Sequence, residues 1–304
     1  MSKFSYSPID RDAHIRHDSE QVLSRLNSDN SRILLWHHGC LLRRLNGLLF
    51  FNFADVLDIL DQLSDPVYLG VDGEVSYFTF DLKQRPEKFK DCETISLRSI
   101  SRQVQEQKIG LLFYAQGILN WHQSHAFCAN CGSSTKVTQA GHARKCVNDH
   151  CDREHYPRIS PAVIFPIINK NGAEQKILLA RQPGWDEGRH SVIAGFAEPG
   201  ESLEDTVRRE AYEETGLVVK NVEYVDSQPW PFPGALMVGF VCETDQTEIH
   251  LLDQELESAH WFSADELEAK LKSGELKMPF DVSISWHLID RWFIEQKGYS
   301  VNDI

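Results

Sequence analysis

The segment from Gly195 to Leu217 constrains what this chain can fold into more than any other, because it joins a glycine-punctuated loop to a strongly charged stretch. Ser202 followed by Asp205 three residues later predicts the start of a helix, since the serine side chain can cap the first backbone N–H groups. Gly216 predicts its end, because glycine adopts the left-handed conformation of a helix stop without strain. We therefore expect one amphipathic helix between these residues.

The glutamates of this helix predict a metal site. Glu210, Glu213 and Glu214 are three and four positions apart, so a helix places them on one face. Like charges on a partly buried face are unfavourable unless a cation neutralises them, and oxygen ligands favour Mg²⁺ or Mn²⁺. Arg209 can pair with Glu213 four residues later. The alternative is a solvated acidic face, but the loop glycines, Glu201 and the glutamate pair near the helix end favour the metal site.

Four of the seven cysteines form a second cluster. Cys128 and Cys131 make one close pair and Cys146 and Cys151 another, with fourteen residues between the pairs. Such a spacing lets four thiolates satisfy a tetrahedral Zn²⁺. The alternative is four thiols that merely pack, but so small a unit would have almost no core without metal. Because no coordination position stays open, we predict a structural zinc.

The other cysteines and the histidines near the zinc cluster are expected to have ordinary roles. We expect buried reduced thiols at the three separate cysteines, Cys40, Cys92 and Cys242. Three histidines could each replace a cysteine ligand, although we expect them at the surface: His142, His150 and His155.

The net charge of −14 at pH 7 limits the partners of the chain. It argues against a protein that grips nucleic acid through phosphate neutralisation alone. No apolar run resembles a signal peptide or reaches the roughly 18 residues of a transmembrane helix, so we expect no membrane partner. An odd number of cysteines, most of them clustered, is typical of a reducing compartment, and we predict a cytoplasmic protein.

Changes in composition and in the pattern of apolar residues divide the chain into three parts. Residues 1–125 carry short apolar runs and turn signals, which predict a small α/β scaffold domain. Residues 126–157 hold the zinc cluster, and residues 158–304 predict the catalytic domain. In the first part we expect strands over 33–36 and 48–51 and a closing helix over 99–121. In the catalytic domain we expect strands over 162–168, 176–180, 222–225 and 236–242. The chain is then expected to end in helices.

A proline-rich run, Ser227-Gln-Pro-Trp-Pro-Phe-Pro-Gly-Ala235, follows the catalytic helix. Its alternating prolines fix an extended, stiff backbone that presents Trp230 and Phe232 at set positions. A rigid loop with aromatic side chains beside a metal site suits a flat base. The alternative is a proline-rich ligand for the groove of another protein.

The helix segment resembles the Nudix signature at every defining position, from Gly195 through Glu201 to Arg209-Glu-Ala-Tyr-Glu-Glu-Thr-Gly-Leu217. The resemblance implies an α+β fold in which a Nudix α/β/α sandwich with a mixed sheet follows the zinc ribbon and the small N-terminal domain. It also implies hydrolysis of a nucleoside diphosphate linked to another group. Glu210, Glu213 and Glu214 would then be catalytic metal ligands, with the Ala194 carbonyl as a further ligand.

The proline-rich run resembles the SQPWPFPxS array of the NADH pyrophosphatase family within the Nudix group, although Ala235 stands where serine is usual. The zinc unit followed by Tyr156-Pro157-Arg158 is also similar to this family. The resemblance implies that Glu255 is another metal ligand and that Tyr156 and Phe196 sandwich the base. The implied lining of the dinucleotide pocket is Gln228, Pro229, Trp230, Pro231, Phe232, Pro233, Gly234 and Ala235, with a backbone contact at Ser285. It further implies a homodimer, with Tyr156 contributed across the interface.

Together these features predict a metal-dependent NAD(H) diphosphatase that yields NMN(H) and AMP from a small-molecule dinucleotide. A second hypothesis is removal of the NAD cap from RNA 5′ ends, which is the same chemistry with capped RNA as the partner. A third is a ligand-sensing Nudix domain without activity, but the expected metal carboxylates are all present.

Overall fold

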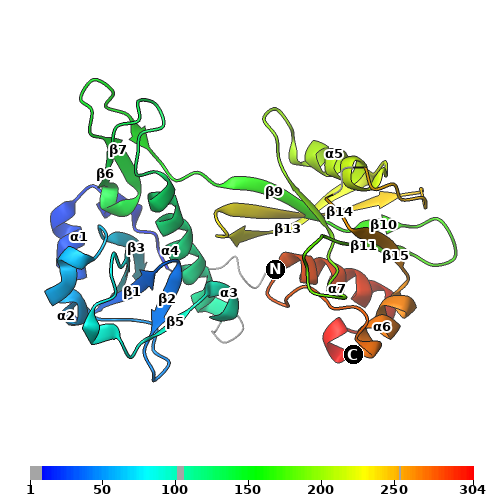
Figure 1. Ribbon diagram of the computed structural model, residues 1–304, viewed down its shortest axis with the longest axis horizontal. Helices are drawn as coiled ribbons and strands as arrows, with labels where there is room; N and C mark the ends of the chain where they lie inside the picture. The colour runs from blue at the N-terminus through cyan, green and yellow to red at the C-terminus, as the bar shows by residue number, and fades with distance from the viewer. Residues whose placement is uncertain (1–8, 101–105, 253–254) are drawn as a thin grey trace. The chain divides into compact units, whose positions relative to one another are not determined.

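The computed structural model describes residues 9–100, 106–252 and 255–304 and divides into two compact units (Figure 1). Among the described residues, the N-terminal unit comprises 9–159 together with 230–234, and the C-terminal unit comprises 160–229 and 235–304. No described helix is long and apolar enough to cross a membrane.

The N-terminal unit is built on a five-stranded sheet in the order β3-β4-β1-β2-β5. Strands β1 and β4 are parallel, and their apolar side chains, such as Ile33 and Phe78, are fully buried. The strands are β1 (Ser31–His37), β2 (Cys40–Arg43), β3 (Val67–Asp72), β4 (Val75–Asp81) and β5 (Glu93–Ile95). The helices are α1 (Ser19–Leu26), α2 (Phe53–Val56), α3 (Leu97–Ile100) and α4 (Glu106–Ser124), with 3-10 turns η1 (Ala13–Ile15), η2 (Leu57–Gln62) and η3 (Glu87–Phe89).

Two predicted elements of this unit differ from the structure. The strand expected over 48–51 is wrong: only Phe51 pairs, through backbone hydrogen bonds with Ile33, because Asn52 already begins α2 with a capping box. The helix expected over 99–121 is present as the end of α3 and most of α4, while 101–105 lie outside the described residues.

The zinc segment adds a three-stranded antiparallel sheet to the N-terminal unit. Its strands are β6 (Thr135–Thr138), β7 (Ala143–Cys146) and β8 (Glu154–His155), with the 3-10 turn η4 (Gln139–Gly141) between the first two. Gly141 lies directly against β3, since a Cβ on this glycine would come within 2.8 Å of Val67 atoms. The small sheet is therefore packed against the larger one, and the two share their stability.

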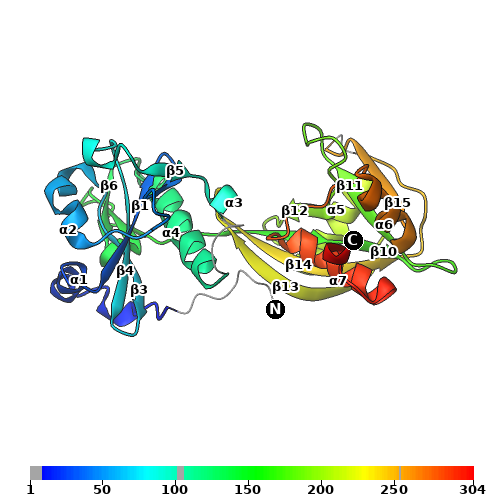
Figure 2. The same cartoon turned by 90° about the horizontal axis from the view of Figure 1, so that it is seen from below.

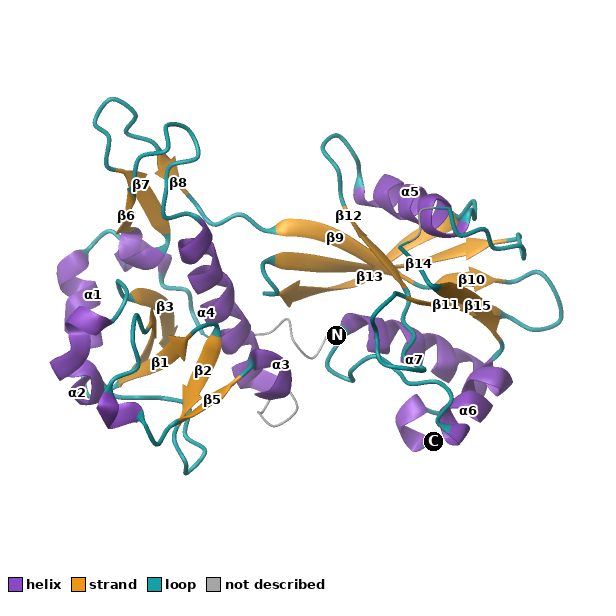
Figure 3. Cartoon of the chain, viewed as in Figure 1, coloured by secondary structure: helices purple, strands orange, loops and turns teal. Residues whose placement is uncertain are grey.

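The C-terminal unit is built on a mixed seven-stranded sheet. Helices lie on both sides of this sheet, as Figures 2 and 3 show. Helix α5 covers one face through Val207 and Ala211, and α6 and α7 cover the other through Leu267 and Leu288. The strands run in the order β12-β9-β14-β10-β11-β15, with β13 beside β14. They are β9 (Ser160–Phe165), β10 (Ile167–Asn169), β11 (Lys176–Arg181), β12 (Ile193–Phe196), β13 (Lys220–Trp230), β14 (Ala235–Thr244) and β15 (Ser258–Phe262). The helices are α5 (Leu203–Thr215), α6 (Ala264–Ser273) and α7 (Ile284–Lys297), followed by η5 (Val301–Asp303).

This arrangement confirms the predicted α/β/α sandwich with a mixed sheet. The single strand expected over 162–168 is instead two strands that break at Pro166, which has no N–H to continue the ladder. Strand β13 extends five residues beyond the predicted 222–225, so Ser227 to Trp230 are strand residues. Of the three separate cysteines, only Cys242 is fully buried, whereas Cys40 and Cys92 are half-buried.

His142 makes the stability of the N-terminal unit sensitive to acid. Burial lowers its pKa to about 4, and its Nε2 donates a hydrogen bond to the Tyr68 carbonyl at 2.7 Å. The pKa of His142 is lower in the folded protein than in the unfolded chain. Between about pH 6.5 and 4, the imidazole is therefore protonated in the unfolded chain and neutral in the folded protein. Stability therefore falls as the pH drops through this window, by about 1–2 kcal/mol at pH 5.

We expect His142→Gln to remove this part of the acid sensitivity, because glutamine keeps an N–H donor but does not titrate. The measurement is the midpoint of thermal unfolding at pH 7 and pH 5. The wild type should lose more than the variant, and His150→Gln, at an exposed position of the same segment, should behave like the wild type. Equal losses in the wild type and His142→Gln would contradict the assignment.

Candidate active site

Helix α5 begins and ends where the sequence predicts. The Ser202 hydroxyl accepts a hydrogen bond from the Asp205 N–H at 3.2 Å, and Gly216 adopts the left-handed conformation with φ of 70°. The apolar side of α5, with Val207 and Ala211, packs against the sheet. Its three glutamates consequently differ in exposure, since only part of their shared face reaches solvent.

The exposure of the glutamates decreases toward the sheet. The Glu213 side chain is 51% exposed, that of Glu210 is 12% exposed, and Glu214 as a whole residue is 2% exposed. Helical spacing places all three together but does not reveal which one is buried. The structure therefore separates an outer carboxylate from two inner ones.

Arg209 links the charged groups around the helix. Its Nη1 donates to Glu210 Oε1 and to Glu213 Oε2, both at 2.9 Å, which confirms the expected pairing with Glu213. Its Nε and Nη2 donate to the two oxygens of Glu201, at 2.6 and 3.0 Å. Nη2 also donates to the Phe196 carbonyl at 2.9 Å, which ties the helix to strand β12. Hydrogen bonds from Arg209 and from the Glu198 N–H lower the pKa of Glu201 to about 2, so this carboxylate stays charged.

Glu210 lies directly over Gly195. A Cβ built on this glycine would come within 1.9 Å of the Glu210 carboxyl carbon, so the glycine leaves the space that the carboxylate fills. Burial raises the pKa of Glu210, and the charges of Glu213 and Glu255 raise it further, against the opposing effect of Arg209. Glu255 is thus electrostatically coupled to the helix. The negative charges around Glu210 are those that a hard divalent cation with oxygen ligands would neutralise, although among the described residues only the four cysteines have their ligand atoms gathered at one point.

We expect Gly195→Ala to lower kcat about 100-fold, because the new methyl group must displace the Glu210 carboxylate by an ångström or more. Gly195 lies in strand β12 without a positive φ, so alanine suits its backbone and the midpoint of thermal unfolding should change little. Kinetics with Mg²⁺ and a thermal scan test this. Wild-type activity in a well-folded variant would show that the position of Glu210 is unimportant.

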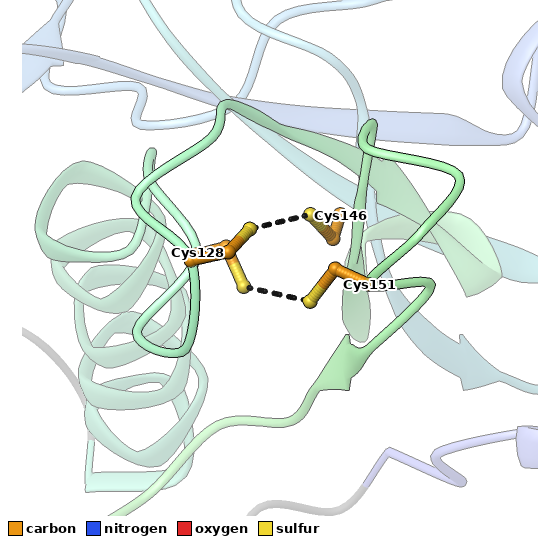
Figure 4. A group of neighbouring side chains, drawn as sticks. Cys128, Cys146 and Cys151 are labelled. Atoms are coloured by element: carbon orange, nitrogen blue, oxygen red, sulfur yellow. Dashed lines mark hydrogen bonds between the residues drawn. The ribbon is translucent and has the colours of Figure 1, made fainter.

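The four cysteine sulfurs are gathered at one point, and Figure 4 shows three of these residues facing one another. All four Sγ atoms lie within 4.8 Å of one another; Cys128 and Cys151 are 3.8 Å apart, and Cys131 and Cys146 are 3.5 Å apart. A tetrahedral zinc with Zn–S bonds of about 2.3 Å requires sulfur separations of about 3.8 Å. The sulfurs therefore fit structural zinc.

The histidines near the sulfurs are only partly as predicted. His150 is exposed, as expected, but His142 is buried, so the surface position expected for it is wrong. His155 is half-buried, with Nε2 3.2 Å from Cys128 Sγ, so it lies only partly at the surface. An N–H beside a thiolate can stabilise the charge of the sulfur. No sequence spacing indicated these contacts, because they depend on how η4 and β8 fold back.

The residues expected to meet the substrate have different environments. Phe196 and Tyr156 are exposed, at 59% and 52%, and the Tyr156 hydroxyl donates to Glu154. Gln228 is fully buried, and its amide bonds the Val282 carbonyl and the Ile284 N–H, at 2.7 and 2.9 Å.

The remaining residues of this predicted set lie on β13, β14, α7 and the turn between the two strands. Ser285 is buried, and its hydroxyl lies 2.9 Å from that of Ser283. Pro229 and Trp230 end β13, Ala235 begins β14 and is buried, and the turn carries Pro231, Phe232, Pro233 and Gly234.

Three family models match the chain in succession. A "NADH pyrophosphatase-like rudimentary NUDIX domain" matches residues 30–121, a "NADH pyrophosphatase zinc ribbon domain" matches 123–156 and a "NUDIX domain" matches 158–280. The N-terminal match was not foreseen, because this part of the chain lacks the glutamate signature.

Curated relatives match over nearly the whole chain. The NAD-capped RNA hydrolase NudC of Mycobacterium bovis is 36% identical over 302 residues, which cover 90% of this chain and 95% of the relative. The human NAD-capped RNA hydrolase NUDT12 is 29% identical over 337 residues, covering 95% of this chain and 72% of the relative. This protein therefore belongs to the NADH pyrophosphatase family of Nudix hydrolases, whose zinc ribbon precedes the catalytic domain.

Proposed function

We propose that the chain hydrolyses the diphosphate bond of NAD(H)-type dinucleotides to NMN(H) and AMP. The observation that carries the proposal is the carboxylate of Glu210 over Gly195, electrostatically coupled to Glu213 and Glu255. The proposed ligands of Mg²⁺ or Mn²⁺ are Glu210, Glu213, Glu214, Glu255 and the Ala194 carbonyl. When bound, such ions neutralise the diphosphate and acidify the attacking water.

The residues of the chain would prepare this reaction in distinct ways. Arg209 holds Glu210 and Glu213 in place through its hydrogen bonds, and its link to the Phe196 carbonyl keeps the helix beside β12. One of Glu213 and Glu214 would accept the proton of the attacking water. Tyr156 and Phe196 are proposed to stack on the base, which suits their exposed rings. The run from Gln228 to Ala235, with Ser285, is proposed to line the pocket for the dinucleotide.

A second candidate substrate is the NAD cap of RNA, which would undergo the same bond cleavage. It is supported by the names of the relatives in Mycobacterium bovis and human, both of which are NAD-capped RNA hydrolases. The net charge of −14 opposes a broad RNA-binding surface. We therefore propose that the cap itself would be the main recognised part of such an RNA.

Side-by-side hydrolysis of NADH, NAD⁺, ADP-ribose and NAD-capped RNA tests the proposal, with Mg²⁺ or Mn²⁺ and chromatographic separation of products. AMP and NMN(H) should form fastest from a dinucleotide or from capped RNA, and the relative rates choose between the two. Faster hydrolysis of ADP-ribose would contradict the proposed substrate class while leaving the Nudix chemistry in place.

The setting of the reaction is also a proposal. We propose a homodimer in the cytoplasm, with functional divisions at 1–125, 126–157 and 158–304. A reducing compartment is supported by the four gathered thiols, which a zinc ion needs in reduced form. Light scattering of the purified chain measures the oligomeric state directly, and a monomer at micromolar concentration would refute the dimer.

A further inference from the structure

The tip of the β13–β14 hairpin belongs to the N-terminal unit, although its strands belong to the other one. This tip, residues 230–234, is the centre of the proline-rich run. One face of helix α4 lies against it: Phe113, Gly117 and Asn120 are spaced by four and three residues and form a single stripe. The stripe combines an aromatic ring, an open position and an amide.

Asn120 satisfies the backbone of the tip. Its Nδ2 donates to the Pro231 carbonyl at 3.0 Å and to the Pro233 carbonyl at 2.9 Å. Prolines have no N–H, so the backbone of these residues offers only acceptors. A side-chain amide has two N–H donors on one nitrogen and can serve both carbonyls at once. This match is specific, because a carboxylate of the same shape would repel both oxygens.

One of the two aromatic side chains of the tip, Phe232, also contacts other residues of the N-terminal unit. The Phe232 ring lies edge-on to Phe113, with centroids 6.2 Å apart, and the Arg98 guanidinium lies 4.7 Å from its centroid. Gly117 leaves room for Pro231, whose Cβ would be 3.7 Å from a Cβ at this position. A glycine inside a helix costs about 1 kcal/mol relative to alanine. A Cβ at this position would make an ordinary van der Waals contact with Pro231, so only a side chain larger than that of alanine would crowd the tip.

The other end of the run is held by a second amide. Gln228 is fully buried and joins β13 to the backbone just before and within the first turn of α7. Asn120 uses its amide nitrogen for two protein hydrogen bonds, and Gln228 uses both its amide nitrogen and its amide oxygen. Asn120 therefore acts on the backbone of the tip, whereas Gln228 fixes the start of the run against α7.

We propose that Asn120 is a positioning residue that fixes the tip of the proline-rich run, which is proposed to meet the dinucleotide, and so contributes to substrate selection. The inference rests on the proposed function, because the run acts on substrate only if the chain hydrolyses dinucleotides. Through Asn120, α4 sets where the carbonyls of Pro231 and Pro233 lie. Loss of this amide weakens substrate binding more than it slows the bond cleavage.

The test compares Asn120→Asp and Asn120→Ala with the wild type and with Gln123→Ala. Gln123 is on the same helix, but its amide bonds Asp81 and is an exposed matched control. Two quantities are measured: hydrogen exchange of the peptide over 226–236, and KM and kcat for NADH. Both Asn120 variants should exchange faster and show a KM at least tenfold higher, with kcat within about threefold; Gln123→Ala should match the wild type.

A third variant keeps the test decisive if the Asn120 variants fold poorly. Gly117→Leu keeps every hydrogen-bonding group and favours the helix, but its Cβ would already touch Pro231 at 3.7 Å, so the larger side chain is expected to crowd the tip. It should raise KM in the same way. Unchanged hydrogen exchange in the folded variants would show that Asn120 does not fix the proline-rich run. Faster exchange with an unchanged KM would show that the contact is purely structural, which also overturns the proposal. If the wild type hydrolyses no dinucleotide, the proposed function fails. The exchange data would still show whether Asn120 fixes the proline-rich run.

Discussion

Glu214→Gln is expected to lower kcat about 1000-fold, equivalent to about 4 kcal/mol of transition-state stabilisation. Glu214 is 2% exposed on the face of α5 that carries Glu210 and Glu213. Glutamine has the same shape but no charge, so it cannot offer an anionic ligand to the divalent ion. The substitution also removes one of several like charges, and the fold should therefore stay intact.

The control for this prediction is Glu204→Gln on the same helix, at an exposed position in the first turn. It makes the same chemical change away from Glu210, Glu213 and Glu214, and it should keep wild-type kinetics. Titration with Mn²⁺ in both variants would show weakened metal binding only for Glu214→Gln. An active Glu214→Gln protein would remove this residue from the proposed metal site.

Cys146→Ser is expected to abolish zinc binding and to unfold the N-terminal unit. Cys146 is 4% exposed, and its Sγ belongs to the cluster of four sulfurs. Structural zinc contributes about 10 kcal/mol or more to the folding of small domains, so loss of one ligand removes most of the stability of the segment. The effect should spread because Gly141 lies against Val67 and His142 bonds the Tyr68 carbonyl.

Zinc content and thermal unfolding are the measurements for this prediction. The wild type should contain one zinc per chain, and Cys146→Ser none, with an early transition that belongs to the N-terminal unit. Cys92→Ser changes a half-buried thiol outside the cluster and should retain zinc. A Cys146→Ser protein with full zinc content would instead require another ligand, for which His155 is the nearest histidine to the Cys128 sulfur.

Local signals of the sequence predicted the catalytic helix and the zinc cluster correctly. The limits of α5 depend on Ser202 and Gly216, which act on backbone groups within one helical turn. The spacing of the cysteine pairs likewise acts over a short stretch of chain. Both features are visible in sequence because the residues that interact are close together along the chain.

The N-terminal unit shows where this approach stops. Its apolar runs predicted an α/β domain, but its relation to the Nudix domain came only from the match to a rudimentary Nudix family model. The strand expected over 48–51 failed because an apolar run does not by itself indicate a strand: only Leu49 and Phe51 are buried, while Leu48 is exposed. The backbone conformation of such a run depends on partners elsewhere in the chain.

The sequence alone therefore determined the helix with its three glutamates, the cluster of four cysteines and the family. The tertiary structure decided which glutamate is buried, why Gly195 must lack a side chain, and where the amides of Gln228 and Asn120 are used. These outcomes depend on contacts between residues that are 15 to 113 positions apart. Such contacts form only when the sheet and helices have packed, so no local pattern of residues can indicate them.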